Sequence, residues 1–344
     1  MPHPDIEIDG NADFQAVPMF DEDGRSIVVA VTKATFCFDA DGALYAVDPE
    51  PVRLSPEFYA DPAESSLKFD SDTAFAKRGT DVVVLGHARS FAGPVQTLEA
   101  GVRVGPVQKV ARIIGDRAWL HDGRTPVLTP ARPFEQMPLT YERAFGGRDH
   151  GGHDPDRPLV EPRNPVGTGF GKPLRAGETC PAPNIVDPRM PNPEYGVPCA
   201  PVGFGFIAPH WMPRAALAGT YDEVWETSRK PLLPADFSRR FFNSASEGLT
   251  SAEFLRGDES VTLVNIGSAP RTSFRLPGSE PPTALFHLRG GREVPTSGVL
   301  DTLVIDADAQ LLTLVWRASV PVRDGIQDVV AVKATCQLSV PGRG

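Results

Sequence analysis

Prolines are concentrated in the middle of this chain, and they limit what that part can fold into. Seventeen of the 36 prolines lie between Pro138 and Pro234. Because proline lacks a backbone N–H and has a fixed φ, so dense a stretch builds loops rather than long helices or central strands. Disordered proline-rich linkers lack large aromatic side chains, but this stretch holds Tyr141, Phe145, Trp211, Tyr221 and Trp225. We therefore expect an ordered, loop-built region, of the kind that usually serves recognition or catalysis.

The two ends of the chain have the composition of β-strands. In the first 135 residues, β-branched runs bounded by glycine turns predict strands over Ser26–Phe38, Asp81–His87, Gly101–Gly105, Val107–Ile114 and Ala118–Leu120. In the last 85 residues, the same pattern predicts strands over Ser260–Ile266, Thr272–Leu276, Ala284–Leu288, Leu300–Ile305, Leu311–Trp316 and Asp328–Val340. Short strands at this spacing are typical of stacked sheets.

The predicted fold is mainly β, with β-sandwich-like sheets formed by the N- and C-terminal parts. A long, ordered, loop-rich central region carries a few short helices. We treat 1–344 as a single domain with an N-terminal β part (1–136), a Pro/Gly-rich central region (137–250) and a C-terminal β part (251–344). The similar segments Val31–Thr35 and Ala331–Thr335 could coincide by chance; the alternative hypothesis is that these two strands pair and close the sheet.

Helical signals are few and lie in the central region. The segment Tyr221–Arg229 is predicted to be a helix, with Thr220 as its N-cap and Glu223 as the capping-box partner. Two shorter helical turns are expected over Pro213–Leu217 and Asp236–Phe242.

Charge and composition exclude several classes of function. The formal charge of -10 and the pI of about 5.2 argue against a nucleic-acid binder and against adhesion to anionic membranes. The longest apolar run, Ile27–Val31, is too short to span a bilayer, and the N-terminus does not resemble a secretory signal. The four scattered cysteines, Cys37, Cys180, Cys199 and Cys336, fit a reducing compartment. We expect a cytoplasmic protein.

Three patterns associated with catalysis or cofactor binding lack the features that this chemistry requires. The loop Gly167–Lys172 has only three residues between its first glycine and Gly-Lys, and Pro173 follows, so a turn is favoured over a phosphate-binding loop. His150 and His153 lie in a glycine-broken run that favours a solvated loop over a metal site. No Gly-x-Ser-x-Gly elbow occurs, and the carboxylates resemble helix-start residues. We therefore predict no catalytic residue, metal or cofactor.

Arginine and aromatic residues of the central region remain as candidates for binding a partner or bracing the loops, because Tyr, Trp and Arg dominate protein interfaces and Arg also hydrogen-bonds carbonyls. We expect Arg143, Arg214 and Arg240 to brace loops or face a partner, and Trp225, Phe241 and Phe242 to be mostly buried. The candidates are Tyr141, Arg143, Phe145, Asn164, Trp211, Arg214, Tyr221, Trp225, Arg240 and Asn243.

Several of these motifs resemble, in order, those of the bacterial family known as domain of unknown function 2169. The resemblance covers nearly the whole chain and rests on Gly115–Arg117 with Trp119, Thr140–Gly147, Asn164–Gly169, Pro183–Ile185, Pro201–Gly205, Gly219–Asp222 with Trp225, Pro234 with Asp236–Phe237, Arg240–Asn243, Asp301–Leu303 and Val315–Arg317. It implies an association with type VI secretion, as a cytosolic adaptor or chaperone that binds a toxic effector and helps load it onto the trimeric spike protein. The segment Ser244–Gly248 departs from the family pattern.

Three functions follow as hypotheses. The first is a non-enzymatic adaptor whose partners are an effector protein and the spike protein, with the central loops as the contact surface. The second is a hydrolase acting on carbohydrate or peptide, which predicts a polar pocket holding titratable groups with shifted pKa values. The third is a structural subunit of the secretion apparatus, which predicts self-assembly.

Overall fold

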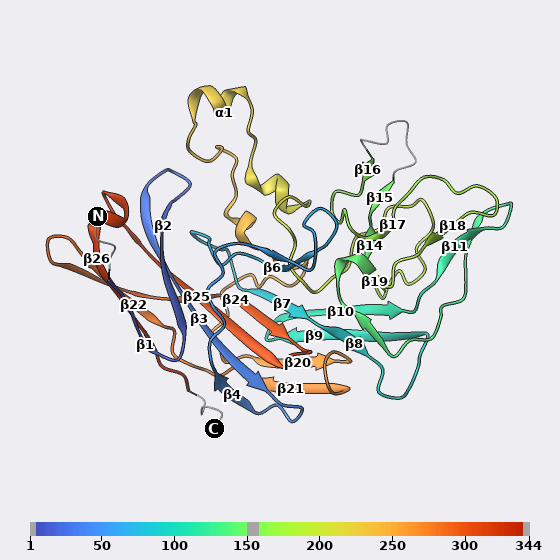
Figure 1. The fold of residues 1–344 in the computed structure, drawn as a ribbon, viewed down its shortest axis with the longest axis horizontal. Coiled ribbons are helices and arrows are strands. Elements are labelled where there is room, and N and C mark those ends of the chain that lie inside the picture. The colour runs from blue at the N-terminus through green and yellow to red at the C-terminus, as the bar shows by residue number, and fades with distance from the viewer. Residues whose placement is uncertain (1–4, 150–157, 340–344) are drawn as a thin grey trace.

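A long, twisted sheet forms the centre of the protein. The computed structural model describes residues 5–149 and 158–339 (Figure 1). In the central sheet β24 and β7 are parallel, the other pairs are antiparallel, and β4 extends the end of β3. Its strands, in spatial order, are β2 (Asp13–Phe20), β3 (Ser26–Phe38), β25 (Leu311–Pro321), β24 (Val299–Asp306) and β7 (Asp81–Leu85), with β4 (Leu44–Val47) paired to β3.

Two smaller sheets lie side by side on one face of the central sheet (Figure 1). Val28 and Ala30 of β3 pack on a four-stranded sheet, whereas Ala34 and Phe36, farther along the same strand, pack on a five-stranded sheet. The four-stranded sheet contains β1 (Asp5–Gly10), β26 (Val329–Cys336), β22 (Thr283–Leu288) and β23 (Arg292–Ser297). The five-stranded sheet contains β19 (Ile185–Val186), β10 (Val107–Ile114), β9 (Thr97–Val104), β20 (Ser260–Val264) and β21 (Arg271–Arg275).

Loops cover the opposite face of the central sheet. Val29 and Val31 of β3 point to that side, as alternation along a strand requires. They pack with Phe75 and with Phe237 and Phe242 of the central region. Every residue of β3 after Ser26 is therefore buried, which explains why this strand reads as a continuous apolar run rather than an alternating one.

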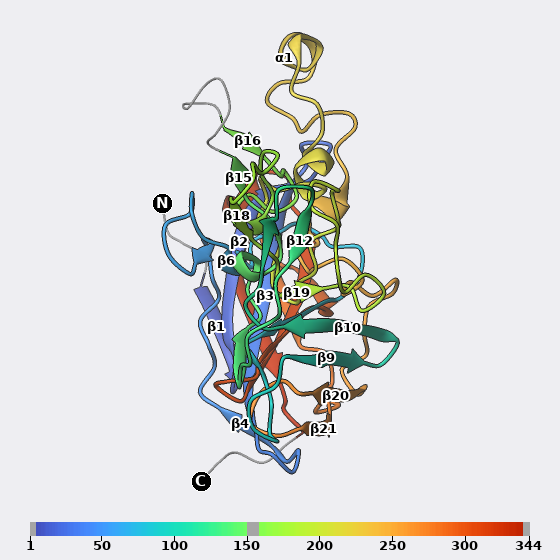
Figure 2. The ribbon, with the colours of Figure 1, turned by 90° about the vertical axis from the view of Figure 1, so that its right-hand side faces the viewer.

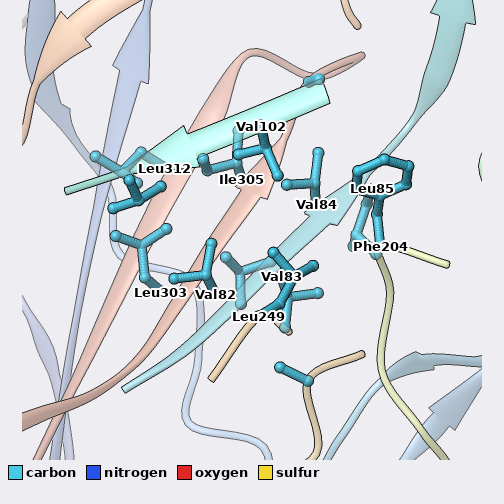
Figure 3. Packing of buried hydrophobic residues seen from close by; sticks show 14 of the residues in the cluster. Val82, Val83, Val84, Leu85, Val102, Phe204, Leu249, Leu303, Ile305 and Leu312 are labelled. Atoms are coloured by element: carbon cyan, nitrogen blue, oxygen red, sulfur yellow. The ribbon is translucent and has the colours of Figure 1, made fainter. Parts of the chain in front are cut away.

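The central region also enters the main core. Figure 3 shows Phe204 and Leu249 packed against Val82, Val83 and Leu85 of β7, and all five side chains are buried. The central loops thus complete the core between the sheets rather than lying outside it. This shared burial gives the proline-rich region the apolar contacts that hold it in place.

The remaining elements are short. The small sheets consist of β5 (Glu57–Phe58) with β6 (Leu67–Phe69), β8 (His87–Arg89) with β13 (Gln136–Pro138), β11 (Ala118–His121) with β12 (Pro126–Leu128) and β18 (Thr179–Pro181), β14 (Phe145–Gly146) with β17 (Thr168–Gly169), and β15 (Arg148–Asp149) with β16 (Leu159–Val160). The helices are η1 (Tyr141–Arg143), η2 (Arg214–Ala218), α1 (Glu223–Ser228), η3 (Arg239–Phe242) and η4 (Gly325–Asp328).

The predicted fold class is confirmed, and of the two interpretations of the similar segments, the one in which they pair is wrong. Val31–Thr35 lies in β3, between β2 and β25, whereas Ala331–Thr335 lies in β26, between β1 and β22. The two similar segments cannot pair because both edges of each strand are already occupied. The N- and C-terminal parts do combine as expected, since every large sheet contains strands from both.

The predicted cap of α1 is also wrong. The side chain of Asp222 accepts a hydrogen bond from the Trp225 backbone N–H at 2.8 Å, so Asp222 is the N-cap. The Thr220 hydroxyl instead donates to the Asp236 carboxylate at 2.7 Å. An aspartate at the N-cap satisfies the free N–H groups of the first turn as well as a threonine does.

Candidate functional site

A cleft in the central region brings four of the ten predicted site residues together. Its volume is about 520 Å³. Tyr141, Arg214, Arg240 and Asn243 line it. Residues that the sequence did not single out complete the lining, among them Arg78, Arg163, Ile207, Met212, Leu217, Ser246 and Glu247.

A buried carboxylate holds part of the cleft lining in place. Asp81 begins β7 and is fully buried. Its Oδ1 accepts hydrogen bonds from Asn243 Nδ2 at 3.0 Å and Thr250 Oγ1 at 2.8 Å. Its Oδ2 accepts from Lys77 Nζ and from the Ser244 backbone N–H, each at 2.9 Å. One side chain therefore ties the segment 243–250 to the edge of the central sheet.

Residues 70–81, which we call the strap, run from the end of β6 to the first residue of β7. Two further ion pairs join it to its surroundings, both at 2.8 Å: Asp72 with Lys33 of β3 and Asp70 with Arg214 of η2. The guanidinium of Arg317, itself paired with the fully buried Asp301 of β24, donates to a strap carbonyl, that of Ala74, at 2.9 Å. Burial lowers the pKa of Lys33, and Asp72 offsets part of this effect.

Arg214 braces the cleft wall, as the sequence led us to expect. Its Nε donates to the Phe241 carbonyl at 2.8 Å and its Nη1 to the Ile207 carbonyl at 2.6 Å, while Nη2 pairs with Asp70. A planar guanidinium with several donors can hold three segments in fixed directions at once. Arg214 is buried and its charge is neutralised, so it serves as a structural element of the wall.

Tyr141 forms another part of the wall. Its ring meets Trp211 edge-on, with centroids 5.6 Å apart, and only 2% of Tyr141 is exposed. The buried hydroxyl makes no hydrogen bond to any residue that the structure describes. Burial raises the pKa of this phenol strongly, and the nearby Ser246 hydroxyl offsets a small part of the shift without reaching hydrogen-bond geometry.

A lysine behind the cleft was not found from the sequence. Lys109 Nζ donates to Ser246 Oγ and to the Glu247 carbonyl, each at 2.7 Å. Burial lowers the pKa of Lys109 to about 8, although nearby carboxylates act in the opposite direction. Lys109 lies in β10, which mixes buried and exposed positions. The sequence pattern therefore did not distinguish it from a lysine on the surface. Both partners of Lys109 lie in Ser244–Gly248, the segment that departs from the family pattern. That departure was the one sequence feature that pointed to this part of the cleft.

The other predicted residues lie elsewhere. Asn164 is buried and its amide donates to the carbonyls of Tyr141 and Phe145, at 2.8 and 3.0 Å. Arg143 pairs with Asp116 at 3.1 Å outside the cleft. Phe145 and Trp211 are buried. These residues brace loops.

Tyr221 and Trp225 belong to a projection that we call the arm, residues 221–235. Both views place α1 at its outer end, away from the body of the protein (Figures 1 and 2). Asp236 accepts two hydrogen bonds from Thr220 and so ties the ends of the arm together. Trp225 Nε1 donates to the Leu232 carbonyl at 2.8 Å inside it.

The arm exposes apolar side chains. Tyr221 is 54% and Val224 69% exposed, whereas Trp225, Phe241 and Phe242 keep only a minor part of their surface in contact with solvent. Arg240 is exposed, and its guanidinium forms no hydrogen bond or ion pair with a residue that the structure describes, so it does not brace a loop in this way.

Two weak motifs gain no support. Thr168–Gly169 of the glycine-rich loop forms a short strand with β14, and no helix follows it. His150 and His153 lie outside the described residues. Within residues 5–149 and 158–339, no cluster of three or more His, Cys, Asp or Glu side chains could hold a metal ion. Cys37 and Cys336 are buried in β3 and β26, where they pack as small apolar residues.

Comparison with known families agrees with the resemblance noted from the motifs. The family model described as "Uncharacterized protein conserved in bacteria (DUF2169)" matches residues 23–317. The chain belongs to this family. No curated protein and no solved structure matches it. Among the helices that the structure describes, none in this DUF2169 protein is both long and apolar enough to cross a membrane.

Proposed function

We propose that this DUF2169 protein is a cytoplasmic, non-enzymatic adaptor that binds an effector protein of a type VI secretion system and assists its loading onto the trimeric spike protein. The resemblance of its motifs supports the class of function. The arm supports a protein-binding role, because aromatic and aliphatic side chains exposed on a braced projection are suited to contact another protein.

The arm is held at its base by the rest of the chain. Arg229 donates to the Leu233 carbonyl within the arm and to the Glu22 carbonyl of the β2–β3 turn. Arg239, which follows the arm, pairs with the Glu22 carboxylate. A projection fixed in this way presents its apolar tip with little further loss of conformational entropy on binding. The exposed Tyr221 and Val224 are the observation that carries the proposal.

Co-purification tests this proposal. The product of a gene adjacent to this chain's gene is expressed, as the candidate effector, with the wild-type protein, with a Tyr221→Ser/Val224→Asp variant, and with a Val127→Asp control. Val127 is 43% exposed in β12, outside the arm. We expect the arm variant to lose the effector by at least about tenfold, as interface hot spots do, and the control to retain it. An effector retained equally by all three proteins, or by none, contradicts the proposal.

A hydrolase is the second candidate, because Lys109 donates a hydrogen bond to Ser246, which lines the cleft. A lysine with a pKa of about 8 can activate a serine only in its neutral form, about one molecule in ten at pH 7. Ser246 is also buried, which makes the adaptor the better-supported function. A fluorophosphonate probe that labels the wild-type protein, but not a Ser246→Ala variant, would favour the hydrolase. Sizing of the purified chain tests the third function, since a structural subunit would assemble into rings or trimers.

A further inference from the structure

We propose that the cleft binds a carboxylate-bearing peptide segment of the partner, with Arg78 and Arg240 holding the carboxylate. This inference rests on the proposed adaptor function and names the chemistry that the cleft recognises. The cleft has a positively charged lining, an apolar wall and a rigid frame.

The lining holds two arginines whose charges are not neutralised. Arg163 pairs with Glu161 at 2.6 Å, and Arg214 pairs with Asp70 at 2.8 Å. Arg78 and Arg240 are exposed, and neither side chain pairs with a carboxylate among residues 5–149 and 158–339. Within the part of the chain that the structure describes, Glu247 contributes the only carboxylate of the cleft lining.

This positive lining stands out on a protein whose formal charge is -10. Two guanidinium groups facing one cavity can each bind a carboxylate through two parallel hydrogen bonds, which is the strongest common recognition of that group. The overall negative charge opposes an acidic partner at long range, but salt screens that repulsion beyond about 8 Å under physiological conditions. The arginines therefore determine binding at close range.

The apolar part of the lining indicates a peptide rather than a small anion. Ile207, Met212, Pro213 and Leu217 line the cleft along with the arginines. Phosphate or another small ion would leave this wall in contact with water, whereas apolar residues beside an acidic one would cover it. Met212 is 38% exposed, and methionine adapts its shape to different apolar ligands. A volume of about 520 Å³ lies in the range of pockets that enclose small ligands.

The wall also contains one unused donor and is held rigidly. The Tyr141 hydroxyl is buried without a hydrogen-bond acceptor among the described residues, and a buried donor of this kind gains from any acceptor that reaches it. Arg214 and Asp81 fix the segments around the cleft. A preformed cleft binds a short segment without first having to order its own loops.

Methyl NMR with defined peptides tests the inference. The full chain has five methionines, so its labelled Met methyl signals are few, and a Met212→Leu variant identifies the Met212 signal. The first probe is the acetylated and amidated pentapeptide Ala-Leu-Glu-Leu-Ala. The second has Gln in place of Glu, the third is the Gln peptide with a free C-terminal carboxylate, and the fourth is inorganic phosphate.

We expect the Glu peptide to shift the Met212 signal saturably and the blocked Gln peptide to bind at least about tenfold more weakly. An Arg78→Gln/Arg240→Gln variant should lose at least about tenfold in affinity for the Glu peptide, whereas Arg275→Gln, at an exposed arginine of β21, should not. Binding of the third peptide would assign the carboxylate to a chain end, and its failure to bind would assign it to a side chain. Equal binding of both blocked peptides, a phosphate shift that matches that of the Glu peptide, or an unaffected double variant would overturn the inference.

The outcome is separable from that of the adaptor proposal. If the neighbouring effector co-purifies with the wild-type protein and the arm variant loses it, but no peptide shifts Met212, the cleft inference fails alone. If the Glu peptide binds but no effector co-purifies, the adaptor proposal fails while the carboxylate site stands. Both arginines to be changed are exposed, so the double variant should unfold at the same urea concentration as the wild type.

Discussion

Substitution of Asp81 by asparagine tests whether a buried charge holds the cleft in place. Asp81 Oδ2 accepts from Lys77 Nζ and from the Ser244 N–H. The asparagine side chain of the variant has one oxygen and one NH2 group. Its NH2 group would face either these two donors or the donors of Asn243 and Thr250. Lys77, whose side chain is 6% exposed, would lose its counter-ion in either case.

The size of the effect follows from the burial. Breaking a buried ion pair by removing one partner costs about 3–5 kcal/mol, because the remaining charge stays desolvated. Whole domains are stable by about 5–15 kcal/mol, so Asp81→Asn should remove a large part of the free energy of unfolding. Asp258→Asn is the matched control: it breaks the ion pair with Arg275, in which the side chains are 48% and 70% exposed, and should cost less than about 1 kcal/mol.

Urea unfolding followed by tryptophan fluorescence measures both variants. The chain has four tryptophans, and Trp211 beside Tyr141 lies in the region that Asp81 supports. We expect a lower midpoint for Asp81→Asn with an unchanged slope, which marks a change in stability rather than in compactness. A loss no larger than that of Asp258→Asn would refute the reasoning, because it would mean that the Asp81 cluster is hydrated in solution.

Two further predictions concern residues that contact the cleft lining. Burial lowers the pKa of Lys109 to about 8 from its usual value of 10.5, so the unfolded chain holds this proton more strongly. The stability of the wild type relative to a Lys109→Met variant should therefore rise by about 1–2 kcal/mol between pH 7.5 and 9.5. A difference in urea midpoints that stays constant or falls over this range would contradict this prediction. In the same urea assay, the free energy of unfolding of a Gly203→Ala variant should fall by about 1–3 kcal/mol, because the added Cβ would lie 2.5 Å from Tyr141 Cζ. The control is Gly171→Ala, whose Cβ would lie 3.5 Å from its nearest neighbour. This control should unfold like the wild type.

The sequence predicted the bounds of individual strands better than it predicted which strands pair. The bounds of β3 and β10 agree with the prediction because each is a β-branched run ended by turn residues, and both signals are local. The parallel pairing of β1 with β26 joins the two ends of the chain. No local pattern encodes such a pairing, so similarity between Val31–Thr35 and Ala331–Thr335 was a poor guide.

The candidate site was predictable only in part, for a related reason. Bulky or multiply donating residues such as Tyr141 and Arg214 stood out among the prolines, and they do meet in the cleft. Asp81 was named only as the first residue of a predicted strand, and Lys109 lay unremarked inside the predicted strand Val107–Ile114. Their importance comes from burial and from partners more than 130 residues away along the chain, which depend on how the sheets stack.

The buried ion pairs beside the cleft fix the positions of the surrounding segments and add little net stability. A buried ion pair seldom stabilises a fold more than a well-packed apolar pair of the same volume would. It does demand one geometry, because each donor must reach an acceptor to avoid the penalty of an unpaired buried charge. The proline-rich region has few backbone ladders. Its ion pair from Arg214 to Asp70 and its hydrogen bonds from Asn243 and Ser244 to Asp81 supply the directional constraints that sheets supply elsewhere. These interactions place Arg240 and Met212 in the lining of one cleft. The paired charges thus fix the shape of the cleft, and the unpaired arginines remain available to bind a carboxylate.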